Sequence, residues 1–201
     1  FICQQSHIDS YDLVEKLQEW APGAAVVAIN GMTDGAACTV LRALTLIDND
    51  DELMIANSDQ YVDVGIDSYL QSMDDGGLDG LIMTMRANDP KWSFVGLDVN
   101  GLVTQVVEKK VISDEATVGI YNFRKGRDFV SAAANMIEQN LSVNGEFYVA
   151  PTYNLLIEMG HRVGVFNVGA EADGMYGLGI PSDLELFLGH PICQKATEIF
   201  Q

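Results

Sequence analysis

The stretch from Leu53 to Tyr61, LMIANSDQY, constrains the fold of this chain more than any other segment. Its first four residues are apolar and the next four are polar. A short apolar run bounded by polar residues is typical of a strand that is buried on both faces of a parallel sheet. Ligands of such sheets bind at the carboxyl ends of strands, so Asp59 is the first candidate for a functional carboxylate. The alternative is that Asn57, Ser58 and Asp59 form an ordinary polar turn.

Apolar runs and amphipathic segments alternate along the rest of the chain. Strands are expected over 24–29, 81–85, 94–97, 102–107, 117–123 and 163–168, and helices over 66–73, 129–137, 153–159 and 183–188. Asn100-Gly101 predicts a hairpin between two of these strands. The sequence has no linker, internal repeat or low-complexity tract. A length of 201 residues fits one α/β domain, so residues 1–201 are interpreted as a single domain.

The charge of the chain excludes one class of partner. The formal net charge is -18 with only 11 Lys and Arg, whereas nucleic-acid binding requires a basic face. The longest apolar runs are shorter than a membrane span and no signal peptide is apparent. Three widely spaced cysteines indicate reduced thiols. We therefore expect a cytoplasmic protein that binds neither nucleic acid nor membrane.

Two local features point towards phosphate ligands. Arg86, Lys91, Lys109 and Lys110 lie in one window around the predicted hairpin, and such cations near a carboxylate indicate a phosphorylated substrate. The alternative is that they are solvated hairpin ends. The small residues 35–37 open a predicted helix after a strand, which suits an anion or a flat base. Here the alternative is close packing of that helix on the sheet.

Seven segments, in order and near the expected spacing, resemble the sugar-phosphate nucleotidyltransferase family of glucose-1-phosphate thymidylyltransferases and capsule-type NDP-sugar pyrophosphorylases. They are TDGAACTVL (33–41), LMIANSDQ (53–60), ANDPKWSFVGLD (87–98), VVEKK (106–110), TVGIYNF (117–123), NGEFYVAPTYN (144–154) and GLGIPSDLE (177–185). The resemblance covers essentially the whole chain. It implies a three-layer, Rossmann-like α/β fold of the GT-A nucleotidyltransferase type, with a mixed, mostly parallel sheet.

The resemblance also implies an enzyme and its reaction. A nucleoside triphosphate would give its nucleotidyl group to a sugar-1-phosphate or similar phosphorylated metabolite, releasing pyrophosphate and forming an NDP-sugar for surface polysaccharide. In-line displacement at phosphorus mainly requires alignment and charge neutralisation. Asp59 matches the family's metal-binding Asp, which would hold Mg²⁺ at the α-phosphate. Lys109 matches the Lys of the E-K-P motif, which neutralises the sugar phosphate.

Five further residues match binding positions of the family. Glu108 and Glu146 match acceptors of sugar hydroxyl groups, and Gly119 matches a glycine near the sugar. Gly35 and Ala36 match backbone that touches the nucleotide base. Because Cys38 stands where many thymidylyltransferases have a base-reading Gln, the base preference is open.

The sequence departs from the family pattern in three places. No G-x-G-x-R loop occurs in residues 1–201, and the resemblance implies that the first strand of the sheet is missing with it. The E-K-P motif reads E-K-K, with Lys110 in place of Pro. Gly177 stands at the position of the second metal-binding Asp, for which either Asp173 or Asp183 could substitute.

These departures leave three functional hypotheses. The first is a nucleotidyltransferase that has little or no activity as residues 1–201 alone, and the second is a non-catalytic module that binds a sugar phosphate or nucleotide. The third, a GT-A glycosyltransferase, would require a D-x-D motif, but Gln60 and Tyr61 follow Asp59. A missing first strand would also leave an apolar slot beside the strands over 25–29 and 53–56. We therefore expect a homodimer or aggregation unless that slot is filled.

Overall fold

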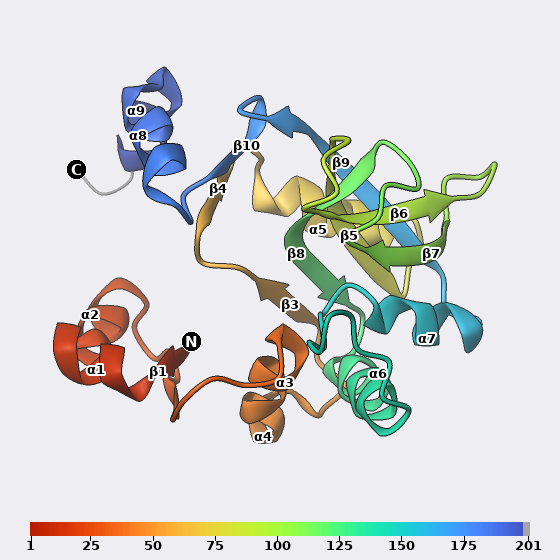
Figure 1. The fold of residues 1–201 in the computed structure, drawn as a ribbon, viewed down its shortest axis with the longest axis horizontal. Coiled ribbons are helices and arrows are strands. Elements are labelled where there is room, and N and C mark those ends of the chain that lie inside the picture. The colour runs from red at the N-terminus through yellow and green to blue at the C-terminus, as the bar shows by residue number, and fades with distance from the viewer. Residues whose placement is uncertain (199–201) are drawn as a thin grey trace.

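An eight-stranded mixed sheet forms the centre of the computed structural model, which describes residues 1–198 (Figure 1). Seven of its strands follow the spatial order β4 (Gln60–Val62), β10 (Gly174–Gly177), β9 (Val163–Glu171), β5 (Gly80–Arg86), β8 (Glu115–Phe123), β6 (Ser93–Leu97) and β7 (Val103–Glu108). The eighth strand, β3 (Leu53–Ala56), pairs with β8 outside this path. The expected α/β fold with a mixed sheet is confirmed.

Strand β8 is the reason that antiparallel pairing is more common than expected. It runs antiparallel to β3, β5 and β6, whereas β5 and β9 are parallel, as are β9 and β10. Strands β3 and β6 pair with opposite ends of β8: Leu53 lies opposite Phe123, and Phe94 lies opposite Ala116. The predicted hairpin is present, because β6 and β7 are antiparallel neighbours.

Helices cover both faces of the sheet and give it three layers. On one face α6 (Gly126–Glu138) and α7 (Thr152–Glu158) form a core with β8, in which the rings of Phe123 and Tyr153 stack 4.5 Å apart. Such aromatic pairs contribute about 0.5–1.5 kcal/mol beyond their buried area. On the other face α5 (Ile66–Asp75) buries Tyr69 and Met73 against a second core.

The N-terminal region is separate from this sheet. Strands β1 (Ile2–Gln4) and β2 (Val27–Ile29) form a two-stranded parallel sheet of their own, joined by α1 (Gln5–Tyr11) and α2 (Leu13–Trp20). Neither α1 nor α2 contains a buried residue. The short helices α3 (Ala36–Val40), η1 (Leu41–Ala43) and α4 (Leu44–Ile47) then lead the chain to β3 (Figure 1).

Strand β3 exists where expected, but its surroundings differ from the prediction. It is antiparallel to its neighbour, and its residues alternate between half-buried and exposed. The prediction of a strand buried on both faces of a parallel sheet is therefore wrong. Only Leu53 and Ile55 contact the core of α6 and α7, whereas Met54 on the other face is 44% exposed. Within residues 1–198 no strand pairs with the second edge of β3, so the expected open edge is present there. The strand over 25–29 was expected beside the same slot, and this part of the prediction is wrong, because β2 pairs with β1 in a separate sheet.

At the edge strand β7, a side chain satisfies part of the exposed backbone. The amide of Asn154 in α7 donates to the carbonyl oxygen of Val106 at 2.8 Å and accepts from the Val106 N–H at 2.7 Å. Both backbone groups of this β7 residue are thereby satisfied. At the C-terminal end of the described chain, α8 (Pro181–Gly189) packs on β10 and is followed by α9 (Pro191–Thr197). Among residues 1–198 no helix has the length and apolarity needed to cross a membrane.

Candidate functional site

Two loops distant in sequence are joined by backbone hydrogen bonds. The N–H of Phe147 donates to the Asp34 carbonyl oxygen at 2.7 Å. The N–H of Ala37 donates to the Phe147 carbonyl oxygen at 2.9 Å. Gly35 has a φ of +112° between them, and a Cβ there would lie 2.5 Å from the Phe147 carbonyl oxygen. Close packing therefore accounts for Gly35, although its neighbour is this loop rather than the sheet. The contact brings Gly35 and Ala36 towards Glu146.

A second contact joins the end of β3 to the middle of β8. The Asn57 N–H donates to the Gly119 carbonyl oxygen at 3.0 Å. The φ of Gly119 is +79°, and a Cβ on this residue would lie 2.4 Å from the side-chain nitrogen of Asn57. The absence of a side chain at 119 therefore allows Asn57 to lie over β8, two residues before Asp59.

Glu108 belongs to a half-buried polar cluster between β6, β7 and β8. The Ser93 hydroxyl donates a short hydrogen bond to its carboxylate. Burial raises the pKa of Glu108, while Ser93 and Lys109 act in the opposite direction. The hydroxyl oxygens of Tyr121 and Thr117 lie 3.0 Å apart behind this pair, and burial raises the pKa of Tyr121 to about 12. The cluster can thus offer a fixed carboxylate to a hydroxyl group.

Lys109 is held by an aromatic residue that the sequence reasoning missed. Its Nζ donates to the Tyr148 hydroxyl at 2.6 Å and lies 4.9 Å from the centre of that ring. The Tyr148 hydroxyl donates in turn to the Glu146 carboxylate. The hydrogen bond to Tyr148 is the main cause that raises the pKa of Lys109. Because Lys109 has a φ of +53°, β7 ends there, and its cation is held beside Glu146 instead of continuing the strand.

Asp59 lies beside a segment from the C-terminal part of the chain. Its carbonyl oxygen accepts from Leu178 N–H at 2.8 Å, and a Cβ at Gly179 would lie 2.7 Å from one of its carboxylate oxygens. The Asp59 side chain is exposed, and the glycine at 179 avoids a contact that a larger residue would make with this carboxylate. Within residues 1–198 no hydrogen bond or ion pair links it to Lys109.

Asp173 and Asp183 are the two candidates for a second metal-binding carboxylate. A Cβ at Gly177 would lie 3.1 Å from a carboxylate oxygen of Asp183, so Asp183 is the one that lies beside position 177. Asp173 instead belongs to the turn between β9 and β10, where its carbonyl oxygen accepts from Ala170 N–H at 2.7 Å. Spacing alone did not distinguish the two residues.

The residues fit a Mg²⁺ ion only as a partial ligand set. Residues 1–198 contain no group of three or more His, Cys, Asp or Glu side chains that could hold a metal ion. Mg²⁺ is commonly bound by one or two carboxylates together with water and substrate phosphates. The exposed Asp59 carboxylate is compatible with that arrangement.

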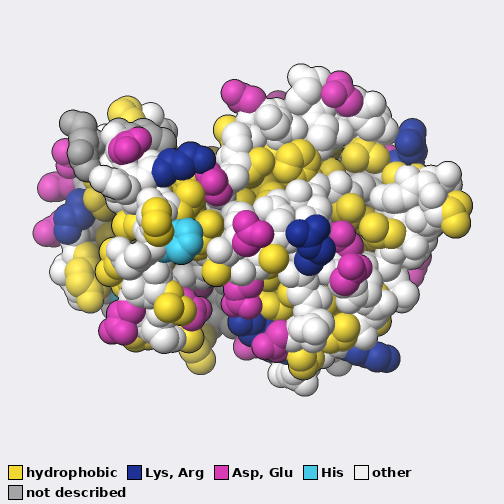
Figure 2. Space-filling view, turned by 90° about the horizontal axis from the view of Figure 1, so that it is seen from above, with side chains coloured by type: hydrophobic (Ala, Val, Ile, Leu, Met, Phe, Trp, Pro, Cys, Tyr) yellow, Lys and Arg dark blue, Asp and Glu magenta, His cyan; other side chains and the backbone are white. Residues whose placement is uncertain are grey.

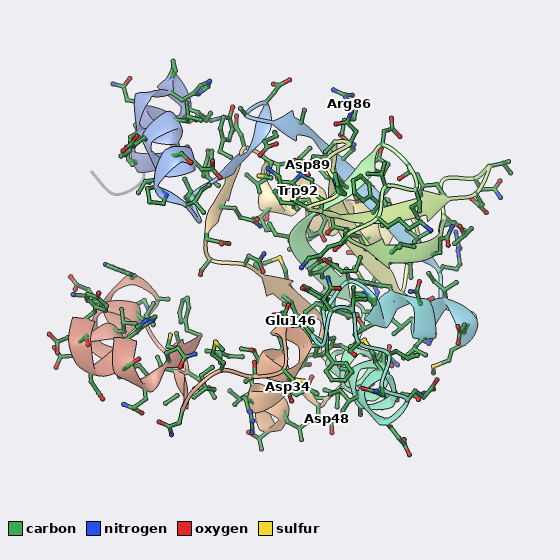
Figure 3. All side chains as sticks on the ribbon, in the orientation of Figure 1. Asp34, Asp48, Arg86, Asp89, Trp92 and Glu146 are labelled. Carbon is green, nitrogen blue, oxygen red and sulfur yellow. The ribbon has the colours of Figure 1, made fainter. Side chains whose placement is uncertain are left out.

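The four basic residues of the predicted window do not form one patch. Lys91 pairs with Glu171 at 2.9 Å and lies over the Trp92 ring. Figure 3 shows Arg86 and Trp92 well apart from Glu146, which lies on the side of Asp34. On the face in Figure 2, the basic side chains are separated by acidic ones. Of this window, only Lys109 contacts the predicted site.

Ser93 could have been found from the sequence, whereas Tyr148 could not. Placing the turn at Asn100-Gly101 brings Ser93 opposite Glu108 in the β6–β7 pair, which the register confirms. Side chains directly opposite each other in an antiparallel pair lie in contact range. Tyr148 lies in a loop, so no periodicity predicts its direction.

Comparison with known proteins identifies the fold. No family model matches the sequence, and no curated protein matches it either. One similar solved structure is a nucleoside-diphosphate-sugar pyrophosphorylase from Vibrio cholerae, with a TM-score of 0.78 and 22% identity over 94% of this chain and 80% of that one. A protein from Bacillus anthracis described as a glucose-1-phosphate thymidylyltransferase has a TM-score of 0.68 and 16% identity over 92% of this chain and 72% of its own. The inositol-1-phosphate CTP transferase of T. maritima has a TM-score of 0.64 and 11% identity over 98% of this chain and 76% of its own. The chain therefore has the fold of these nucleotidyltransferases.

Proposed function

We propose that this chain is a nucleotidyltransferase domain that joins a nucleoside triphosphate to a sugar-1-phosphate or a similar phosphorylated metabolite. The fold supports the reaction class. The observation that carries the proposal is the chain of contacts from Lys109 through Tyr148 to Glu146. It holds a cation and a carboxylate side by side, next to the half-buried Glu108. A ligand with a phosphate and adjacent hydroxyl groups matches this pattern of charge.

The reaction is an in-line displacement. An oxygen of the sugar phosphate forms a bond to the α-phosphorus of the triphosphate, the bond from that phosphorus to the bridging oxygen breaks, and pyrophosphate leaves with the electron pair. Lys109 neutralises the attacking phosphate, and Tyr148 fixes the direction of the ammonium group. Holding the two reactants in line removes much of the entropy cost of the bimolecular step.

The two glutamates would orient the sugar. One oxygen of Glu108 accepts from Ser93, which leaves the other for a substrate hydroxyl. Glu146 accepts from Tyr148 and lies at the end of the loop that meets Gly35. In this proposal Ala36 and Gly35 lie beside the base, and Gly119, on which Asn57 packs, lies near the sugar.

Asp59 would hold Mg²⁺, which when bound supplies charge neutralisation at the α-phosphate. With one carboxylate, this site depends on the triphosphate for its remaining ligands. We propose a cytoplasmic enzyme, in line with its three free cysteines, whose NDP-sugar product serves surface polysaccharide. Assembly as a homodimer through the open β3 edge belongs to the same proposal.

One observation favours a second candidate function. No G-x-G-x-R segment occurs in the 201 residues, so the cations that would hold the triphosphate are not supplied by them. Under this alternative the chain binds a sugar phosphate or nucleotide without turnover. Both candidates use Lys109, Glu108 and Glu146 in the same way, and they differ only in pyrophosphate release.

The test combines binding with turnover. Calorimetry would measure the affinity for a panel of sugar-1-phosphates, and pyrophosphate release would be followed for each nucleoside triphosphate. If the native chain releases pyrophosphate and Asp59→Asn does not, the result supports a nucleotidyltransferase. If the native chain binds a sugar-1-phosphate without releasing pyrophosphate, and Lys109→Ala loses this binding, the result supports a non-catalytic binding module. No binding of any sugar phosphate would contradict both.

A further inference from the structure

A cavity of about 230 Å³ lies between β10 and α8, away from the Lys109 side of the sheet. Its walls include the aromatic side chains of Tyr176, Phe187 and His190 and the carboxylates of Glu171 and Asp183. The segment 177–179 separates it from Asp59, since Leu178 bonds to the Asp59 backbone. The proposed reaction uses no residue of this cavity, although Asp183 is one of the two candidates for a second metal-binding carboxylate.

The aromatic walls are fixed by their neighbours. The Tyr176 ring lies 6.0 Å from that of Phe187 and 5.2 Å from that of His190, measured between centroids. Phe187 is buried and packs behind on Tyr61 at 5.7 Å. The Nδ1 atom of His190 accepts from Ile192 N–H at 3.2 Å, which fixes the orientation of the imidazole. The rings therefore present a preformed, tilted aromatic surface.

The charge around this surface is negative. Lys91 is one cation close to it, and its pKa is raised first by Glu171 and also by Asp89 and Asp183. Lys195 is a second, and its pKa is raised first by Asp63, with which it pairs, and also by Tyr61 and Tyr176. Lys91 pairs directly with Glu171 at 2.9 Å. Among residues 1–198, no hydrogen bond or ion pair reaches the Asp183 carboxylate, although it lies on the cavity wall.

We infer that this cavity binds a small alkylammonium ion. Aromatic faces attract a cation whose charge is spread over methyl or methylene groups, and such faces form the recognised sites for quaternary ammonium ligands. Asp183 supplies an opposite charge that no group of the described chain neutralises directly. A phosphate or carboxylate ligand would meet the carboxylates of Glu171 and Asp183 on the cavity wall, which would repel it. A cavity of this volume suits a ligand of only a few heavy atoms.

The experiment compares choline with 3,3-dimethylbutan-1-ol, its neutral carbon isostere, by calorimetry on the full chain. We expect choline to bind at least tenfold more tightly, and inorganic phosphate not to compete. The probes contain no nucleotide or sugar, so the result is independent of the proposed reaction. Equal affinity for choline and the alcohol, or displacement of choline by phosphate or Mg²⁺, would overturn the inference.

Matched variants locate the ligand. Asp183→Asn should weaken choline binding about tenfold, whereas Glu185→Gln, an exposed acid on the same helix outside the cavity, should leave it unchanged. Tyr176→Phe should retain binding and Tyr176→Leu should lose it, because the ring supplies the attraction. Thermal unfolding of each variant would verify that it is folded. Equal behaviour of Asp183→Asn and Glu185→Gln, or of the two Tyr176 variants, would contradict the site.

Discussion

The central sheet and the N-terminal region both contain regularly patterned apolar residues but bury them very differently. In β5 every residue from Gly80 to Met85 is buried, because helices cover both faces. In α2 the apolar face is just as regular, yet Trp20 is 66% exposed. The comparison shows that periodicity predicts an element, whereas burial depends on whether another element lies against it. One part of the candidate site lies just after the N-terminal region, where Asp34 contacts Phe147.

The largest effect is expected from substitutions that test this difference in burial. Phe123→Ala removes a buried ring packed between Phe129 and Tyr153, and should lower the free energy of unfolding by about 3–5 kcal/mol. Trp20→Ala should lower it by less than about 1 kcal/mol, because the side chain is mostly exposed. Urea denaturation measures both. Equal losses would show that α2 is packed against another element in solution.

The contact between residues 34–37 and the loop at Phe147 can be broken at one glycine. Gly35→Ala places a methyl group against the Phe147 backbone and forces a φ of +112°, so it should cost about 1–3 kcal/mol and separate the loops. Hydrogen exchange of the Ala37 and Phe147 amides would report the separation. Gly31→Ala is the matched control, since it also has a positive φ, +77°, but meets nothing within 4 Å. Unchanged exchange in Gly35→Ala would contradict this account of the junction.

A binding measurement tests the site on the side of the central sheet. Lys109→Ala should weaken sugar-1-phosphate binding by about 1.5–3 kcal/mol, because it removes a charge-assisted contact. Lys110→Ala should have little effect, since Lys110 is exposed and follows the end of β7. Calorimetry would compare the two. Losses of the same size would mean that general charge attraction, rather than a fixed ammonium group, binds the phosphate.

The smallest effect concerns pH. Burial raises the pKa of Glu108 above its ordinary value of 4.5, so the folded state favours the protonated form. The protonated Glu108 carboxyl group therefore contributes fully to the free energy of unfolding below pH 4.5. This contribution is lost as the pH rises through the raised pKa of Glu108 and the carboxyl group ionises. Glu108→Gln should therefore be slightly more stable than the native chain at pH 7, with the advantage disappearing on acidification. Denaturation curves across this range, with Glu146→Gln as the control, would detect it. A Glu108→Gln variant that is less stable at pH 7 would reverse the expected sign.

Long, strongly patterned elements could be predicted from the sequence, and short ones could not. Strands β5 and β8 and helix α6 were expected within a few residues of their observed bounds. The three-residue β4 was missed because its pairing with β10 depends on residues more than a hundred positions away. The burial of β3 was misjudged because its run of apolar residues does not reveal that one edge lacks a partner strand.

The candidate site likewise contains residues that the sequence could predict and others that it could not. The positions of Glu108, Lys109 and Glu146 follow from sequence motifs. In the structure Tyr148 links Lys109 to Glu146, while Ser93 holds the carboxylate of Glu108. The location of Asp183 beside Gly177 depends on the path of the chain between β10 and α8. No spacing rule predicts such a path.

The amide of Asn154 has a consequence for how copies of the chain can meet. An incoming strand at the β7 end would have to displace this side chain from both backbone groups of Val106 before it could form a ladder. Stacking of sheets into a continuous filament requires that growth proceed at both ends. Asn154 occupies one of the positions that β7 would offer to such a partner, so strand addition at this edge would first cost its two hydrogen bonds to Val106.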